Sequence, residues 1–154
     1  ASILADHFDA DARNKGIGGE VFRPTLSALK DDGFEPEIIS VAYGTNDWSK
    51  LSKEEFDRNC ETFYSDLARL YPKARIISLA PIWRVDHNRT TAVGEFSYVA
   101  NKLNEIASNI PNMTVVDCFP FVPHDVNMYL DLRVHPNNEG FAHYAKGIIK
   151  ALEN

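Results

Sequence analysis

Three short apolar runs, each bounded by turn-forming or charged residues, predict buried β-strands along the chain. They cover residues 38–43, 76–80 and 114–118 and are rich in β-branched side chains. Such side chains pack well on the pleated surface of a sheet. We therefore expect three buried strands.

A period of three to four residues between apolar positions predicts a helix after each of these strands. Ser52 and Glu55 form a capping-box pattern that marks the start of the first helix. Pro136 limits the chain to an extended approach, so the third helix is expected to begin near Asn137 or Asn138. The apolar faces are Phe56, Cys60, Phe63, Leu67 and Leu70 in the first helix, Phe96, Val99, Leu103, Ile106 and Ile110 in the second, and Phe141, Tyr144, Ile148 and Leu152 in the third.

The alternation of strands and helices indicates the fold class. Parallel neighbours need crossover connections, so this order predicts an α/β domain whose parallel sheet is covered by helices on both faces. No linker, repeat or low-complexity stretch divides residues 1–154, and we expect one domain. Before the first strand, residues 1–8 look like the end of a helix, and residues 10–13, if they form a strand, are polar enough for an edge. Functional groups are expected at the carboxyl ends of the strands.

Composition and charge exclude several classes of protein. With 22 acidic and 16 basic residues, the formal net charge is -6, which repels the phosphates of nucleic acids. No run of about 18 apolar residues could span a bilayer, so we expect no integral membrane association. The two cysteines, Cys60 and Cys118, match no zinc-binding spacing and are expected to be buried thiols. Nothing in the sequence indicates an oligomeric state.

A glycine-rich turn spans residues 14–19, ahead of the first predicted strand. Gly16, Gly18 and Gly19 permit positive φ angles and leave backbone N–H groups uncovered by side chains. Such N–H groups can bind an anion. Glycine turns are also common as plain connections, and a flexible turn is the alternative interpretation.

Gly44, Thr45, Asn46 and Asp47 come directly after the first predicted strand. An asparagine amide at the carboxyl end of a strand can donate a hydrogen bond to a developing oxyanion, whereas we expect Asp47 to order the loop. The alternative is an Asx turn, which Asn and Asp favour by bonding their own backbone. The position after a buried strand favours a functional role for Asn46.

Asp131 and His135 combine a carboxylate with a titratable base just before Pro136 and the last helix. His135 is therefore the candidate base, and Asp131 is the candidate acid that orients it. A solvated or helix-capping histidine is the alternative interpretation. The remaining histidines form none of the spacings known for metal sites, and we expect no metal. They are His7, His87, His124 and His143.

The glycine-rich turn, the Gly-x-Asn-Asp motif and the late His-Pro pair resemble, in this order, three sequence blocks of the SGNH hydrolases, a GDSL-like family of lipases and acylhydrolases. The resemblance runs from about Ala1 to the C-terminus. It implies a flavodoxin-like three-layer α/β/α sandwich that hydrolyses small-molecule esters, and occasionally thioesters or amides, without a cofactor. It also implies that Gly19 and Asn46 belong to the oxyanion hole and that His135 and Asp131 act with a serine nucleophile.

Two tryptophans lie close to these motifs. Trp48 follows the Asn46 turn and Trp83 follows the second predicted strand. Either ring could line a substrate pocket or could pack in the core. Short-chain esters and acetyl esters of carbohydrates are the substrates that the family resemblance suggests.

Two features depart from the family pattern. The Gly-Asp-Ser block that carries the nucleophile does not occur before Asn14, and Ser2 lies too close to the glycine-rich turn to replace it. We therefore expect that roughly 20 to 30 further residues precede this segment and supply the first, central strand and the serine. The 154-residue chain by itself is expected to be inactive.

The second departure concerns the acid. The family usually shows Asp-x-x-His, whereas three residues separate Asp131 from His135 and Leu132 occupies the expected acid position. A one-residue bulge could still bring the Asp131 carboxylate to the imidazole Nδ1. Without it, a backbone carbonyl could orient the ring and leave a serine–histidine dyad.

An alternative function is a module that has lost the nucleophile and binds an acylated carbohydrate or peptide. The retention of Asn46 and His135 argues against it, because binding needs no base beside an oxyanion donor. A flavodoxin-like nucleotide binder is less favoured still, because no Gly-x-Gly-x-x-Gly follows a strand. A cytoplasmic location is expected, although the location also depends on the missing N-terminal block, with which any secretion signal would have been lost.

Overall fold

A parallel three-stranded sheet organises the chain in the computed structural model, which describes residues 2–27 and 33–153. Its strands are β1 (Ile38–Val41), β2 (Arg75–Leu79) and β3 (Met113–Val116), hydrogen-bonded in that order. Ile39, Ile76 and Met113 are direct neighbours across the sheet. The predicted strands and the α/β class are confirmed, although each strand ends one or two residues earlier than the apolar run.

The chain divides into two compact units. The first consists of residues 1–19, 82–85 and 118–154, and the second of residues 20–81 and 86–117. Among its described residues, the second unit contains the sheet and the helices α2 (Pro24–Ser27), α3 (Thr45–Lys50), α4 (Lys53–Leu70) and α5 (Ser97–Ala107). That residues 1–154 form one domain stays a prediction.

The capping box predicted at the start of α4 is confirmed. Ser52 Oγ accepts a hydrogen bond from the Glu55 backbone N–H at 3.3 Å, and Glu55 Oε2 accepts one from the Ser52 backbone N–H at 3.0 Å. These bonds satisfy two N–H groups that the first helical turn cannot pair. The buried face of α4 follows the predicted period and consists of Phe56, Cys60, Phe63, Tyr64 and Leu67.

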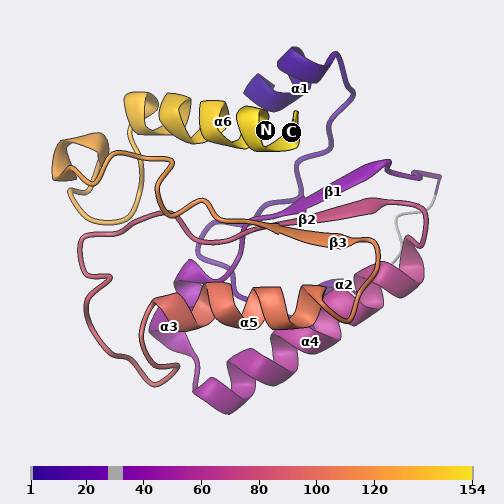
Figure 1. The fold of residues 1–154 in the computed structure, drawn as a ribbon, viewed down its shortest axis with the longest axis horizontal. Helices are drawn as coiled ribbons and strands as arrows, with labels where there is room; N and C mark the ends of the chain where they lie inside the picture. The colour runs from indigo at the N-terminus through magenta and orange to yellow at the C-terminus, as the bar shows by residue number, and fades with distance from the viewer. Residues whose placement is uncertain (1, 28–32, 154) are drawn as a thin grey trace. The chain divides into compact units, whose positions relative to one another are not determined.

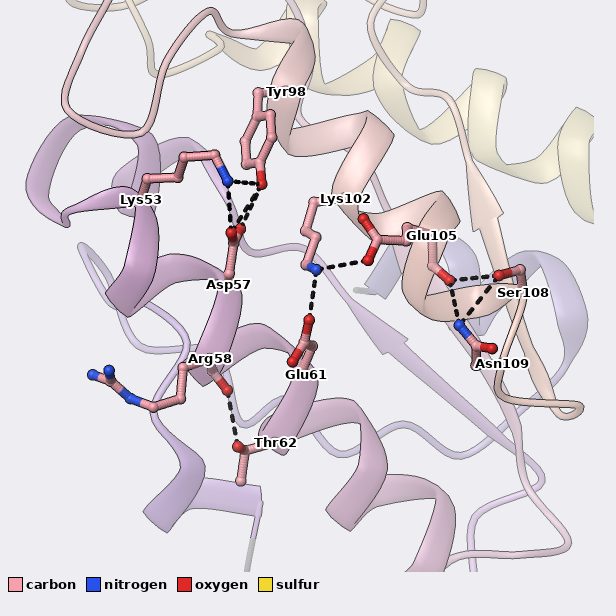
Figure 2. Close-up of polar contacts among 10 residues, drawn as sticks. All are labelled: Lys53, Asp57, Arg58, Glu61, Thr62, Tyr98, Lys102, Glu105, Ser108 and Asn109. Atoms are coloured by element: carbon pink, nitrogen blue, oxygen red, sulfur yellow. Dashed lines mark hydrogen bonds and ion pairs between the residues drawn. The ribbon is translucent and has the colours of Figure 1, made fainter.

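Helices α4 and α5 lie side by side on one face of the sheet (Figure 1), and polar side chains join them along their length (Figure 2). Asp57 on α4 accepts hydrogen bonds from Tyr98 Oη at 2.8 Å and from Lys53 Nζ at 2.8 Å. Lys102 on α5 forms ion pairs with Glu61 of α4 and with Glu105 of its own helix. The two helices are thus joined by charges as well as by apolar packing.

The sequence did not predict Lys102 on the buried face of α5, because the apolar positions that recur every three to four residues do not include it. Its side chain is only 7% exposed, whereas the side chains of Glu61 and Glu105 are 53% and 64% exposed. Burial lowers the pKa of Lys102, but its hydrogen bonds with the two glutamates outweigh this effect and hold that pKa above its ordinary value. The aliphatic stem can therefore fill the helix interface while the ammonium stays charged.

The first unit contains α1 (Ser2–Phe8), the short 3-10 helix η1 (Val126–Met128) and α6 (Asn138–Leu152). Its core is Trp83, Val122 and Tyr129, against which Ile82, Phe119, Met128 and Tyr144 pack. The Asn137 side chain caps α6 by accepting the Gly140 backbone N–H at 2.9 Å, which confirms the predicted start of the last helix. None of the helices within the described ranges is both long and apolar enough to cross a membrane.

One prediction for this unit is wrong, and a strand that was considered only conditionally does not form. Phe141 was predicted on the buried face of α6 but is 51% exposed. Helix α6 instead approaches Met128 of η1 through Gly140, where an added Cβ would lie 2.5 Å from the Met128 carbonyl oxygen. Because Gly140 occupies the contact, the next residue, Phe141, points away from it. Residues 10–13 form no strand, since all four are exposed and offer no apolar face to a sheet.

The capping box gives a test of local helix stability. Ser52→Ala removes an N-cap acceptor, which typically lowers the free energy of unfolding by about 1 kcal/mol. Ser65→Ala, at an exposed position inside α4, is the matched control and should change the free energy of unfolding little or raise it slightly, because alanine favours helices. Urea denaturation measures both, and equal losses in the two variants would contradict the capping role.

Candidate active site

The Asn46 turn lies between β1 and α3, where the chain leaves the carboxyl end of a strand. Gly44 has a φ of 112°, and a Cβ at this position would lie 2.6 Å from Val99 Cγ1, so only glycine fits without a shift. Asp47 is fully buried, and its carboxylate accepts the backbone N–H of Gly44 at 2.9 Å and that of Phe22 at 2.8 Å. Burial raises the pKa of Asp47, against the opposing effect of these two hydrogen bonds.

Asn46, the candidate oxyanion donor, is half-buried in the first turn of α3. Its Nδ2 donates to the backbone carbonyl of Glu20 at 3.1 Å. An amide nitrogen carries two hydrogens, so this bond fixes the side chain and uses one of them. The Asp47 hydrogen bonds agree with the loop-ordering role expected of it, but Phe22 was not foreseen as a partner because it lies 25 residues away in sequence.

The glycine-rich turn precedes this region in the chain. The backbone N–H of Gly16 donates to Asn14 Oδ1 at 3.0 Å, and Gly19 has a φ of 78°, in the left-handed region that favours glycine. Gly19 is joined by its peptide bond to Glu20, the residue that Asn46 binds. Gly19 belongs to the first unit and Asn46 to the second, and their shared oxyanion hole stays a prediction.

Asp131 and His135 lie in contact within the first unit. Asp131 Oδ2 is 2.7 Å from His135 Nδ1, and because a carboxylate only accepts, Nδ1 is the donor. Oδ1 accepts the backbone N–H groups of Arg133, Val134 and His135 at 3.0, 2.8 and 3.0 Å. Leu132 takes up the extra residue of the Asp-x-x-x-His spacing with a φ of 56°.

The loop that carries these residues is closed at its base. The Leu130 backbone N–H donates to the His135 carbonyl at 2.7 Å, and Tyr129 pairs with Pro136 in an isolated antiparallel bridge. The His135 side chain is 78% exposed. With Nδ1 bound to Asp131, the ring leaves Nε2, on its far side, available to exchange a proton.

Hydrogen bonding sets the charge state of Asp131. Partial burial raises the pKa of its carboxyl group, but the hydrogen bonds from the backbone N–H groups of Val134 and His135, and from the His135 ring, outweigh this effect. The pKa of Asp131 is therefore held well below its ordinary value. The acid beside His135 is a carboxylate at neutral pH.

Both tryptophans pack inside their units, which is the alternative that the sequence left open. Trp48 is 1% exposed, and its Nε1 donates to the Gly94 carbonyl at 2.9 Å. Trp83 stacks on His124 with ring centroids 5.2 Å apart, and its carbonyl accepts from Tyr129 Oη at 2.7 Å. A pocket-lining role for either ring stays a prediction.

The remaining candidate ligands do not assemble into a metal site within residues 2–27 and 33–153, where no three His, Cys, Asp or Glu side chains come together for one ion. Cys60 and Cys118 are both buried thiols outside any disulfide, as predicted. Burial also raises the pKa of the Cys60 thiol, which keeps it protonated and unreactive.

Comparison with known proteins connects these features to a family. A family model described as GDSL-like Lipase/Acylhydrolase matches residues 1–143. No curated protein matches the sequence. The solved structure of a lipase/acylhydrolase from Enterococcus faecalis is 15% identical with a TM-score of 0.75, and the match covers 99% of this chain and 83% of that protein.

Two further solved structures are much longer than this chain. A carbohydrate esterase family 3 protein from Talaromyces cellulolyticus is 20% identical with a TM-score of 0.59, and the match covers 77% of this chain and 57% of that protein. A salicylyl-acyltransferase from a tetracycline biosynthetic pathway is 18% identical with a TM-score of 0.67, and the match covers 86% of this chain and 42% of that protein. These likenesses confirm the predicted flavodoxin-like α/β fold.

The depressed pKa of Asp131 has a consequence for stability. A carboxylate whose pKa is lower in the folded state stabilises the fold above its unfolded pKa of about 3.9, and the contribution is lost as the pH falls further. Asp131→Ala should therefore lower the free energy of unfolding at about pH 5, and by less below about pH 4. Urea denaturation from about pH 7 to about pH 3 measures the difference in free energy of unfolding between the wild type and the variant. A difference that does not become smaller in acid would contradict the stabilising role of the ionised Asp131.

Proposed function

This chain belongs to the GDSL-like lipase/acylhydrolase family, and we propose that it carries the base, the acid and two oxyanion donors of a serine esterase. The observation that supports this most directly is the contact between Asp131 Oδ2 and His135 Nδ1 at 2.7 Å. The orienting carboxylate is bound to one ring nitrogen while the imidazole remains exposed. This is the arrangement that a general base needs.

In the proposed reaction, His135 Nε2 takes the proton of a serine hydroxyl as the serine oxygen attacks the carbonyl carbon of an ester. The ester C–O bond then breaks, and the imidazolium gives its proton to the leaving alcohol. A water molecule, activated by the same ring, releases the acid from the acyl-serine. Asp131 keeps the ring in the correct tautomer and stabilises the imidazolium. None of these steps uses a cofactor.

The oxyanion formed in each attack is assigned to two groups of this chain and one of the serine. The Asn46 amide has a second hydrogen beyond the one bound to Glu20, and the Gly19 backbone N–H lies in the glycine-rich turn. The backbone N–H of the serine supplies the third donor. Each such donor typically contributes about 10²- to 10³-fold to the rate.

The nucleophile is proposed to lie N-terminal to Ala1, on the loop after the first strand of the domain. Short-chain carboxylic esters, and acetyl esters of carbohydrates among them, are the proposed substrates. The family match and the carbohydrate esterase among the similar structures support this choice. Because the chain covers only 57% of that esterase and 42% of the acyltransferase, the activity of the whole protein is part of the proposal.

Hydrolysis of p-nitrophenyl acetate by the full-length gene product tests the role of His135. His135→Ala removes the base and should lower kcat by about 10³-fold or more. His143→Ala, at an exposed position on α6, is the matched control and should leave kcat unchanged. Equal activity in the two variants would remove His135 from the mechanism.

The same assay tests the proposed position of the nucleophile. The 154-residue chain should show no turnover, and a fluorophosphonate should label the full-length protein at a serine upstream of Ala1, as located by peptide mass spectrometry. Labelling within the 154 residues would contradict the proposal. Failure of the full-length protein on short-chain, long-chain and sugar esters alike would instead favour a module that binds acylated ligands.

A further inference from the structure

Asp47 is a fully buried charged group in the sheet unit, and both of its carboxylate oxygens are used. Oδ2 accepts the Gly44 backbone N–H at 2.9 Å, and Oδ1 accepts the Phe22 backbone N–H at 2.8 Å. Burying a carboxylate costs free energy unless hydrogen bonds satisfy it. The two backbone N–H groups supply these bonds, and in return the carboxylate fixes the positions of both backbone segments. The bonds tie two segments that are 25 residues apart in sequence.

A second hydrogen bond runs between the same two segments in the opposite sense. Asn46 Nδ2 donates to the Glu20 carbonyl at 3.1 Å, so the 20–22 segment receives from Asn46 and donates to Asp47. The adjacent side chains of Asn46 and Asp47 thus hold one short stretch of backbone between them. The direction of the Asn46 amide depends on the position of the Glu20 carbonyl, two residues from the N–H that Asp47 binds.

The far end of this connection is rigid. Phe22 is fully buried, and its ring lies against Tyr43, Phe63 and Tyr64 with centroid distances of 5.3, 5.3 and 5.5 Å. The near end is constrained as well, because Gly44 has a φ of 112° and closely approaches the Val99 side chain. The Asp47 carboxylate therefore joins two fixed backbone positions, the N–H groups of Gly44 and Phe22. Asn46, which carries the amide, lies between Gly44 and Asp47 in the chain.

From this arrangement we propose that Asp47 is a positioning residue of the oxyanion hole, which fixes the Asn46 amide through the Gly44 and Phe22 backbone without touching the substrate. The inference rests on the proposed function of Asn46. A misplaced oxyanion donor loses transition-state stabilisation while ground-state binding is little affected. Loss of Asp47 should therefore act on kcat and leave KM nearly unchanged.

The first experiment is a double-mutant cycle on the full-length protein with p-nitrophenyl acetate. Asp47→Asn replaces one of the two accepting oxygens by an NH₂ group, which cannot accept a hydrogen bond, so one backbone N–H loses its acceptor. This change should lower kcat by about 10- to 100-fold. In an Asn46→Ala background the same change should have less than about a twofold effect, since the donor it positions is gone. An undiminished loss in that background would overturn the proposal, because it would mean that Asp47 acts on the fold and not through Asn46.

Asp57→Asn is the matched control for the isosteric change. Asp57 on α4 also accepts two donors, Tyr98 Oη and Lys53 Nζ, but neither donor belongs to the Gly44 turn. Asp57→Asn should leave kcat unchanged. If Asp47→Asn does not fold, as judged by urea denaturation, Asp47→Glu takes its place in the cycle, because it keeps the charge but displaces both oxygens by one methylene.

A second readout separates this inference from the proposed esterase activity. In ¹⁵N-labelled full-length protein, the Asn46 side-chain NH₂ signal is identified by its loss in Asn46→Ala. Asp47→Asn should shift this signal and speed its exchange with water, whereas Asp57→Asn should not; an unchanged signal would overturn the positioning role. If no ester is turned over, the proposed function fails, and this measurement still decides whether Asp47 fixes the Asn46 amide.

Discussion

Parallel pairing of β1, β2 and β3 is the constraint on which the sheet unit depends. Parallel neighbours cannot be joined by tight hairpins, so each connection must cross back over the sheet, as α4 does between β1 and β2 and α5 between β2 and β3. The same pairing directs all three strands one way and leaves their carboxyl ends at one edge. Gly44 begins the turn at that edge, and its close approach to Val99 of α5 shows how the crossover helix limits the shape of the loop.

Two aspartates order the candidate site by the same means but with opposite electrostatics. Asp47 and Asp131 each accept backbone N–H groups and so fix a loop that regular secondary structure does not. Around Asp47 burial dominates and raises the pKa, whereas around Asp131 the hydrogen bonds dominate and lower it. The buried carboxylate therefore serves as a structural tie. The exposed one stays ionised beside His135, where it would stabilise the imidazolium of the proposed mechanism.

The features predicted from sequence are those that local patterns determine. The period of α4, its capping box at Ser52 and the order of the elements all follow from residues within a few positions of one another. Two departures came from tertiary contacts that no local pattern records. Phe141 is exposed because Gly140 lets α6 approach Met128, and Lys102 occupies a buried position because glutamates on two helices can pair with it.

The same distinction applies within the candidate site. Asp131 and His135 are four residues apart, and the bonds that bring them together lie inside one short loop, so a sequence motif was enough to find them. The spacing could not show how the extra residue is accommodated, because that depends on the positive φ of Leu132. The Asn46 amide differs, since its hydrogen bond goes to the Glu20 carbonyl, 26 residues away along the chain. In the proposed mechanism, the general base can thus be encoded almost locally, whereas the oxyanion donor requires the fold.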